Sequence, residues 1–317
     1  MRALIVGING QDGSYLAELL LDKGYEVHGT VRRSSHPNLQ RLETTRDRLN
    51  LHWADLTDAS SLASAIDASM PDEVYNLGAM SDVRVSFDTP VYAGNVTGVG
   101  AVRLLDLVWR LRPGAKFYQA GSSEMFGMNP DVPTNEASTF CPGSPYAAAK
   151  VYAHHVAQNY RDGYGMFVAT GILFNHESPR RGVEFVTRKI TRAVAAIDAG
   201  RATRVSLGSL ESRRDWGHAK DYVEAMWLML QTETPADFVV ATGEAHSVQE
   251  FAEIAFGHVG LDWKEHVVSD PNMKRPLDPP VLLGDATKAG IVLGWEPTAG
   301  FKELVTEMVD ADMADLT

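Results

Sequence analysis

Residues 3–16 read ALIVGINGQDGSYL, a short apolar run followed by glycines at positions 7, 10 and 13. The run Ala3–Val6 predicts a buried strand, and Ser14–Asp22, with apolar residues at helical spacing, predicts the next helix. Glycines between a strand and a helix allow a tight turn and close approach of the backbone to a pyrophosphate, which the helix N-terminus attracts. We expect a dinucleotide site here, the alternative being a turn without a ligand.

Strands and helices continue to alternate through the first half of the chain. We expect further strands at Glu26–Val31, Leu51–Trp53, Glu73–Leu77, Lys116–Gln119 and Phe167–Thr170, and helices at Ala59–Asp67, Val91–Arg110 and Tyr146–Arg161. This alternation predicts an α/β fold, a Rossmann-type doubly wound parallel sheet with right-handed crossovers.

The pattern changes after about residue 175, where proline, glycine and basic residues become frequent and strands shorten. We expect residues 1–172 to form the dinucleotide-binding domain and residues 173–317 mainly a smaller C-terminal α/β lobe that binds substrate. Parts of 215–243, a helix at Ala219–Gln231 and a strand at Phe238–Ala241, are expected to return to the first domain. A proline-rich loop and a final helix at Phe301–Asp312 complete the lobe.

Composition limits the class of protein. With 44% hydrophobic and 22% charged residues, the chain has the balance of an ordinary folded protein. Its single cysteine, Cys141, excludes an intrachain disulfide and favours a reducing compartment. The N-terminal apolar run is too short for a signal peptide, and no stretch has the length of a membrane span. We expect a cytoplasmic protein.

Charge is unevenly distributed. The net charge of −12 argues against a nucleic-acid binder, yet residues 180–214 carry nine basic and three acidic side chains. That basic segment suggests a small anionic ligand, the alternative being a solvated helix face.

The residues after the second predicted strand indicate which dinucleotide binds. Arg32-Arg33-Ser34-Ser35 stands where a site for NAD usually has an acidic residue. Arginine complements a 2′-phosphate and serine can donate to it, which favours NADP over an exposed basic turn. We expect Asp55-Leu56 to frame the adenine and Leu77-Gly78-Ala79 to pass near the cofactor.

A tyrosine and a lysine four residues apart, Tyr146 and Lys150, share one face of a predicted helix. An ammonium beside a phenol favours the phenolate, so we expect Lys150 to lower the pKa of Tyr146 and Tyr146 to take a hydroxyl proton from the substrate. The alternative is a surface tyrosine beside a lysine.

The turn after the strand at Lys116–Gln119 reads Ser122-Ser123-Glu124. A hydroxyl there can bond the substrate's C4 oxygen. Once C4 is a ketone, one carboxyl group, Glu124, can remove the acidified C5 proton and protonate a leaving C6 hydroxyl. A simple reductase or epimerase needs no such carboxylate; the alternative for Glu124 is a helix cap or a salt bridge.

Neither histidines nor large apolar side chains suggest another site. His154 and His155 are adjacent on a helix and point different ways, so we expect no metal. Trp216 and the pair Met226 and Met229 are expected in the core.

Long segments make the chain similar to the GDP-mannose 4,6-dehydratase family of extended short-chain dehydrogenases, over nearly its full length. The matching segments are residues 10–17 (GQDGSYLA), 32–35 (RRSS), 73–79 (EVYNLGA), 117–120 (FYQA), 144–146 (SPY), 171–181 (GILFNHESPRR), 185–189 (FVTRK) and 214–217 (RDWG).

The resemblance implies a hydro-lyase with catalytic residues Ser122, Glu124, Tyr146 and Lys150. It implies NADP contacts from Gly7, Asn9, Gly10, Gln11, Asp12, Arg32, Arg33, Ser34, Ser35, Asp55, Leu56, Leu77, Gly78, Ala79, Ser81, Tyr92, Lys150, His176 and Arg181. It implies a GDP-sugar held by Ser81, Ser122, Ser123, Glu124, Tyr146, Asn175, Lys189, Arg214 and Arg275. It also implies a homodimer or homotetramer.

Several positions depart from the family pattern: Asn9, Gly121, Ser122 and Gly143 replace larger or different residues, and residues 277–280 (LDPP) replace an Ala/Thr-Glu-Val pattern. Gly121 and Gly143 could admit a larger sugar such as a manno-heptose. The short segment after Ser35 leaves dimer or tetramer open.

The expected reaction is redox-neutral: hydride leaves C4 for NADP and returns to C6, giving GDP-4-keto-6-deoxymannose. The alternatives are a dehydratase of a related nucleotide sugar such as GDP-manno-heptose and a 4-epimerase or 4-keto reductase on the same fold. A non-catalytic nucleotide-binding regulator is the least favoured.

Overall fold

A computed structural model describes residues 1–35, 37–273 and 275–316. Its centre is a seven-stranded sheet in the order β10-β6-β5-β4-β1-β2-β3, with every neighbouring pair parallel. The strands are β1 (Arg2–Val6), β2 (Glu26–Val31), β3 (Leu49–Trp53), β4 (Glu73–Asn76), β5 (Lys116–Ala120), β6 (Val168–Leu173) and β10 (Asp237–Val240). The predicted fold class, a Rossmann-type parallel sheet, is confirmed.

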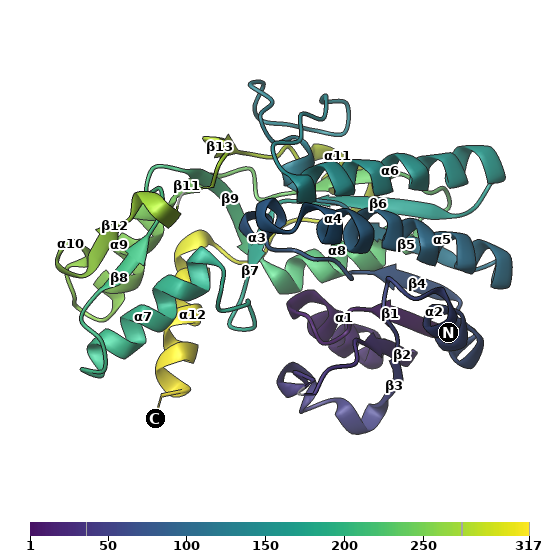
Figure 1. Ribbon diagram of the computed structural model, residues 1–317, viewed down its shortest axis with the longest axis horizontal. Coiled ribbons are helices and arrows are strands. Elements are labelled where there is room, and N and C mark those ends of the chain that lie inside the picture. Colours follow the sequence, from purple (N-terminus) through teal and green to yellow (C-terminus); the bar gives the residue numbers. More distant parts are fainter. Residues whose placement is uncertain (36, 274, 317) are drawn as a thin grey trace.

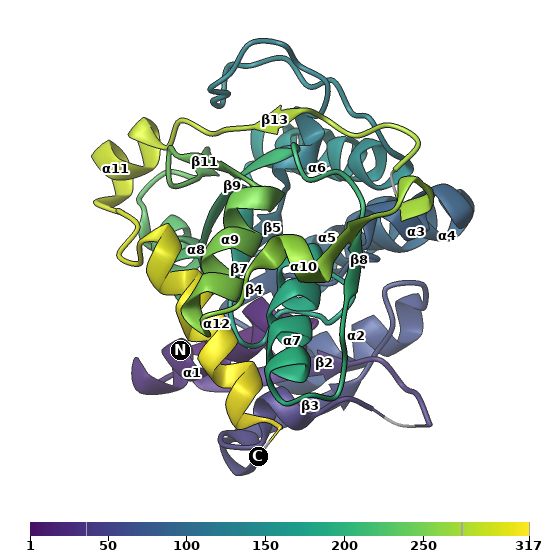
Figure 2. The same ribbon diagram turned by 90° about the vertical axis from the view of Figure 1, so that its left-hand side faces the viewer.

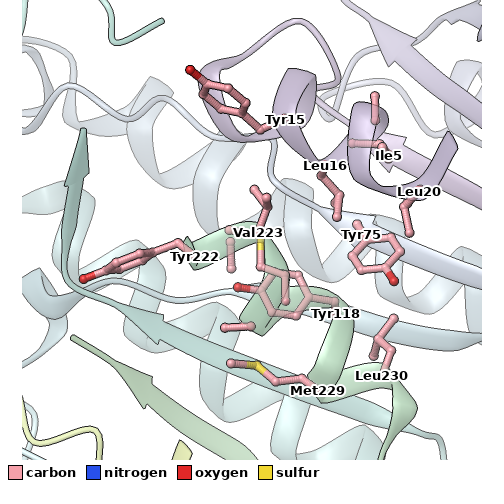
Figure 3. Packing of buried hydrophobic residues seen from close by; sticks show 14 of the residues in the cluster. Ile5, Tyr15, Leu16, Leu20, Tyr75, Tyr118, Tyr222, Val223, Met229 and Leu230 are labelled. Carbon is pink, nitrogen blue, oxygen red and sulfur yellow. The ribbon is translucent and has the colours of Figure 1, made fainter. Parts of the chain in front are cut away.

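Helices cover both faces of this sheet (Figure 1). Helices α1 (Gln11–Asp22) and α8 (Ala219–Gln231) pack side by side on one face, and Figure 3 shows Leu16, Val223 and Met229 interlocking there with Tyr118 of the sheet. Helices α2 (Ala59–Ser69), α5 (Gly100–Leu111) and α6 (Pro145–Tyr164) pack on the other face. Met226 and Met229 are fully buried, as predicted.

The predicted helix Val91–Arg110 is interrupted. It consists of α4 (Pro90–Ala93), a π-helical segment η3 (Gly94–Val99) and α5. Glycines let this segment pack closely: a Cβ at Gly98 would lie 3.2 Å from Tyr152 of α6, and one at Gly100 would lie 2.8 Å from Leu56. Six residues are too few for apolar periodicity to distinguish a π-helix from an α-helix.

The smaller lobe lies beside the sheet (Figures 1 and 2). Strand β9 (Arg213–His218) pairs with β7 (Asn175–Glu177), β11 (Ala245–Ser247) and β13 (Val281–Leu282), and β8 (Val205–Leu207) pairs with β12 (Val267–Ser269). Helices α7 (Val186–Asp198), α9 (Val248–His258) and α12 (Phe301–Ala314) enclose its core, which includes the 2% exposed Trp216.

Short elements complete the two parts of the structure. They are the helices α3 (Val83–Asp88), α10 (Trp263–His266) and α11 (Thr287–Leu293), and the 3₁₀ turns η1 (Gln40–Leu42), η2 (Arg46–Arg48), η4 (Ser123–Met125) and η5 (Pro271–Met273).

The chain crosses between the two parts more than once. It leaves the main sheet after β6, enters the lobe, and returns through α8 and β10, which pairs with β6. It then re-enters the lobe at β11. Within the described residues, no helix combines the length and apolarity needed to cross a membrane.

We predict that Gly13→Ala destabilises the protein. The added Cβ would lie 2.4 Å from the Gly7 carbonyl oxygen and 2.6 Å from the Ile8 Cα, both backbone atoms that cannot move aside alone. The free energy of unfolding should fall by about 2–3 kcal/mol in urea denaturation. Gly163→Ala in α6 is the control, because a Cβ there meets no atom within 4 Å; it should stabilise by about 0.5 kcal/mol. Equal effects of the two changes would contradict this account.

Candidate active site

The carboxyl ends of β1, β4, β5 and β6 meet at one edge of the sheet, where a cavity of about 270 Å³ opens. Sixteen of the predicted site residues line it: Gly7, Gly10, Gln11, Asp12, Leu77, Ala79, Ser81, Ser122, Ser123, Glu124, Tyr146, Lys150, Asn175, His176, Arg181 and Arg275. Residues up to 268 positions apart in the sequence therefore border one space. Parallel strands produce this convergence because their carboxyl ends lie on the same side.

The glycine turn has the shape that a dinucleotide needs. Gly7 has a φ of +86°, and a Cβ on it would lie 3.2 Å from the backbone of Gly78 at the end of β4. A Cβ on Gly10 would lie 3.2 Å from the Gly7 carbonyl oxygen. Side chains are thus excluded where a pyrophosphate would approach the start of α1, and these residues fit such a group.

An ion pair behind this turn joins α1 to the lobe. The Asp12 carboxylate lies 2.9 Å from His176 Nε2, while His176 Nδ1 lies 2.7 Å from the Phe174 carbonyl oxygen. Both ring nitrogens face acceptors, an arrangement in which the protonated form of His176 satisfies both contacts. Burial opposes the Asp12 charge, but the contacts with His176 lower the pKa of Asp12 to about 2. Burial lowers the pKa of His176, but the Asp12 charge outweighs this effect and the pKa is raised.

The other predicted cofactor residues do not line this cavity in the part of the chain that the structure describes. Arg32, Arg33, Ser34 and Ser35 are exposed just beyond β2, where Arg32 Nη1 donates to the Tyr92 hydroxyl at 2.8 Å. Three other predicted cofactor residues contact neighbouring loop residues. The Asn9 side chain donates to the Asn38 carbonyl oxygen, the Asp55 carboxylate accepts from the Thr57 backbone N–H, and Leu56 packs beside Gly78.

The four predicted catalytic side chains border this same cavity. Ser122 and Glu124 come from the turn after β5, and Tyr146 and Lys150 from the first turns of α6. Tyr146 is 8% exposed and Glu124 is 7% exposed. Lys150 Nζ donates to the Ala120 carbonyl oxygen at 2.8 Å and lies 5.7 Å from the centre of the Tyr146 ring.

The electrostatics differ from expectation at Tyr146. Burial raises the pKa of Tyr146 to about 12, aided by the Glu124 charge and opposed by a hydrogen bond with Ser122 and by Arg181. Burial also lowers the pKa of Lys150 to about 8. In the protein without its cofactor the pKa of Tyr146 is therefore raised, and not lowered as expected, because loss of solvent outweighs the Ser122 hydrogen bond and the Arg181 charge.

A second cavity, of about 440 Å³, shares Asn175, Arg181 and Arg275 with the first. It is also lined by Lys189, Arg214 and Trp216 of the lobe. The basic residues of the segment 180–214 therefore have different roles. Lys189 and Arg214 face the cavity, whereas Arg188 forms a buried ion pair with Asp312 at 2.6 Å. Burial lowers the pKa of Arg214.

Sequence reasoning missed several lining residues. Arg41 borders the first cavity, and its guanidinium donates to the carbonyl oxygens of Arg180 and Asn9. Asp278 borders the second and pairs with Arg214 at 2.7 Å. Neither lies in a motif of fixed spacing. Asp278 falls in the segment 277–280 that departs from the family pattern, and the only signal at Arg41 was its charge.

Comparison with known proteins gives consistent matches. The family described as GDP-mannose 4,6 dehydratase matches residues 4–308. GDP-mannose 4,6 dehydratase 2 of Arabidopsis thaliana is 55% identical over 98% of this chain and 86% of its own length. The human GDP-mannose 4,6 dehydratase is 51% identical over 98% of this chain and 91% of its own length. Among solved structures, UDP-glucose 4-epimerase of Thermus thermophilus in complex with NAD superposes with a TM-score of 0.88 at 26% identity, covering 98% of this chain and 99% of that one.

We predict that Lys150→Met stabilises the protein near neutral pH. The unfolded lysine keeps its proton up to about pH 10.5, whereas the folded one releases it near 8. Between these values the unfolded state binds more protons, so the free energy of unfolding rises with pH, and below pH 8 the folded state bears the full cost of a buried ammonium. The variant should gain about 2 kcal/mol at pH 7, allowing for the lost hydrogen bond to Ala120.

That gain should disappear near pH 10.5 in urea denaturation followed at several pH values. The exposed Lys302→Met serves as the control and should show no pH-dependent difference from the wild type. If the difference in unfolding free energy between Lys150→Met and the wild type does not change with pH, or if the variant is less stable at pH 7, the lowered pKa of Lys150 is contradicted.

Proposed function

The chain belongs to the GDP-mannose 4,6-dehydratase family, and from this we propose that it converts GDP-mannose into GDP-4-keto-6-deoxymannose through Ser122, Glu124, Tyr146 and Lys150. It is a hydro-lyase: the reaction removes one water and leaves the substrate at the same overall oxidation state. The observation that carries the assignment of roles is the Glu124 carboxyl group on the same cavity as Tyr146 and Lys150.

The protein's own groups divide the proton transfers. Tyr146 takes the C4 hydroxyl proton, with the Ser122 hydroxyl bonding the same oxygen and Lys150 beside the ring. Glu124 removes the C5 proton and delivers it to the departing C6 hydroxyl, which leaves as water and creates a C5–C6 double bond. When that double bond is reduced at C6, C5 takes up one proton, which balances the proton that Tyr146 removed from the C4 hydroxyl. Bound NADP would supply hydride acceptance from C4 and return to C6, and its cationic ring would lower the pKa of Tyr146.

The choice of NADP rests on the residues beyond β2. Arg32, Arg33, Ser34 and Ser35 present two guanidinium groups and two hydroxyls to solvent at the carboxyl edge of the sheet. These groups match a 2′-phosphate. Asp12, His176 and Arg181 line the first cavity, which would hold the rest of the cofactor.

The second cavity suits a nucleoside diphosphate-sugar. Lys189, Arg214 and Arg275 supply three positive charges for a diphosphate, and Asn175 lies at the junction of the two cavities. Two glycines, Gly121 and Gly143, help to distinguish mannose from a larger sugar. A Cβ on Gly121 would lie 2.9 Å from the Gly171 carbonyl oxygen, and one on Gly143 would lie 3.3 Å from Met128. Because protein atoms already occupy these directions, the glycines add no space for a heptose, which supports mannose.

Exposed apolar side chains support a homodimer or homotetramer. Val91 is 85% exposed, Tyr152 of α6 48% and Val99 of η3 45%. Such residues are costly to leave in water and are typical of a subunit contact. A cytoplasmic location is supported by the free, exposed Cys141, which suits a reducing compartment.

Replacing the carboxyl group tests the elimination. Glu124→Gln keeps the shape of the side chain but cannot remove the C5 proton, so the turnover number for dehydration should fall at least about 100-fold. Exchange of hydride at C4 should persist. Dehydration is measured by mass spectrometry of the product, which shows the loss of one water. Hydride exchange at C4 is followed by the absorbance of the reduced nicotinamide. Exposed Glu211→Gln should behave as the wild type. A dehydrated product formed by Glu124→Gln at a near-normal rate would overturn this role.

Removing both guanidinium groups tests the cofactor choice. In the double variant Arg32→Ala, Arg33→Ala, the dissociation constant for NADP should rise about 100-fold, because two charge-assisted hydrogen bonds are lost, while that for NAD should change less than about threefold. Titration calorimetry measures both. Arg46→Ala, which removes an exposed arginine of η2, is the control. Equal weakening of the two dinucleotides would contradict the proposal.

A further inference from the structure

A line of alternating charges connects the proposed base to the substrate cavity. Arg275 Nη1 lies 2.9 Å from Glu124 Oε1 and 3.5 Å from Asp278 Oδ1. The same Asp278 oxygen lies 2.7 Å from Arg214 Nη2. Glu124 and Asp278 therefore share one guanidinium, and Asp278 sits between two.

Asp278 is held in place on its other side. The Ser212 hydroxyl donates to Asp278 Oδ2 at 2.8 Å. Arg214 is 7% exposed, and its Nη1 donates to the carbonyl oxygens of Arg213 and Pro279 at 2.8 and 2.9 Å. These bonds fix Arg214, and through it they fix the Asp278 carboxylate beside Arg275.

The charges are close to balanced before a diphosphate arrives. Arg214 and Arg275 face Asp278 and Glu124, and Lys189 adds one positive charge whose described contact is the Met273 sulfur at 3.4 Å. A diphosphate carries two negative charges and would compete with both carboxylates for Arg275. How firmly Arg275 holds Glu124 then depends on what else Arg275 can bind.

That competition matters for the chemistry. A carboxylate in a close ion pair with a guanidinium is a weaker base, because the pair favours its charged form. Glu124 must gain a proton from C5 and pass one to the C6 hydroxyl, so it works best when Arg275 is shared or drawn away. Asp278 is the protein group placed to share it.

We propose that Asp278 is a positioning residue of this active site, which shares Arg275 with Glu124, so weakens the ion pair between Arg275 and Glu124, and leaves the base freer to exchange protons with the substrate. This rests on the proposed function, in which Glu124 is the base. Asp278 acts through Arg275 and touches none of the reacting atoms.

The test begins with Asp278→Asn, which keeps the shape and the Ser212 contact but removes the charge. Arg275 then has Glu124 as its one carboxylate partner among the described residues. The turnover number should fall about tenfold while KM rises less than about twofold. Reduced cofactor should accumulate, because C4 oxidation does not need Glu124 and the elimination does. Asp278→Glu, which keeps the charge, should restore most of the turnover.

A double-mutant cycle with Arg275→Ala separates positioning from other roles. Once Arg275 is absent, Asp278→Asn should cause no further loss of turnover. A loss of the same size in both backgrounds, or a turnover number for Asp278→Asn within about twofold of the wild type, would overturn the proposal. Asp131→Asn, an exposed aspartate in the loop before α6, is the charge-matched control.

Unfolding temperatures are recorded for every variant. If Asp278→Asn does not fold, Ser212→Ala takes its place in the cycle, with an expected loss of about two- to threefold that also vanishes without Arg275. The wild-type product mass is measured in the same experiments. If the wild type removes no water from GDP-mannose, the proposed function fails; if it does and the cycle is additive, only the role of Asp278 fails.

Discussion

The close approach of β1 to the first turn of α1 is the constraint on which the site depends. With only 2.4 Å between a Cβ at Gly13 and the Gly7 carbonyl oxygen, the helix can start where it does only if residue 13 has no side chain. That placement brings Asp12 to His176, and this ion pair ties the main sheet to β7 and the lobe. The glycine turn and part of the wall of the first cavity are thus positioned by the start of α1.

Burial gives the site its chemistry at a cost in stability. The same removal of water that raises the pKa of Tyr146 and lowers that of Lys150 leaves both groups in unfavourable surroundings. The protein compensates with specific bonds: Lys150 to the Ala120 carbonyl, and Glu124 to Arg275. In the proposed mechanism Glu124 must loosen its contact with Arg275 in order to act as a base, and the charge of the bound ligands competes for that arginine.

Local chemistry explains what the sequence could and could not predict. Glycines at 7, 10 and 13 and the spacing of Tyr146 and Lys150 belong to short segments, so the strand β1, the helix α1 and the helix α6 could be predicted from them. Arg41 meets Arg180 across 139 positions, and Asp278 meets Arg214 across 64, so no spacing rule could place either contact. The pKa of Tyr146 depends on burial by many elements together, which a motif of five residues does not contain.

The most direct test of the central claim follows one hydrogen atom. GDP-mannose carrying deuterium at C4 is converted by the enzyme, and the product is examined by mass spectrometry and by proton spectra. If Tyr146 and Glu124 work on one ring beside one cofactor, each product molecule has lost one water and carries the deuterium at C6. Deuterium that stays at C4, or that is lost to solvent or to released cofactor, would contradict the account.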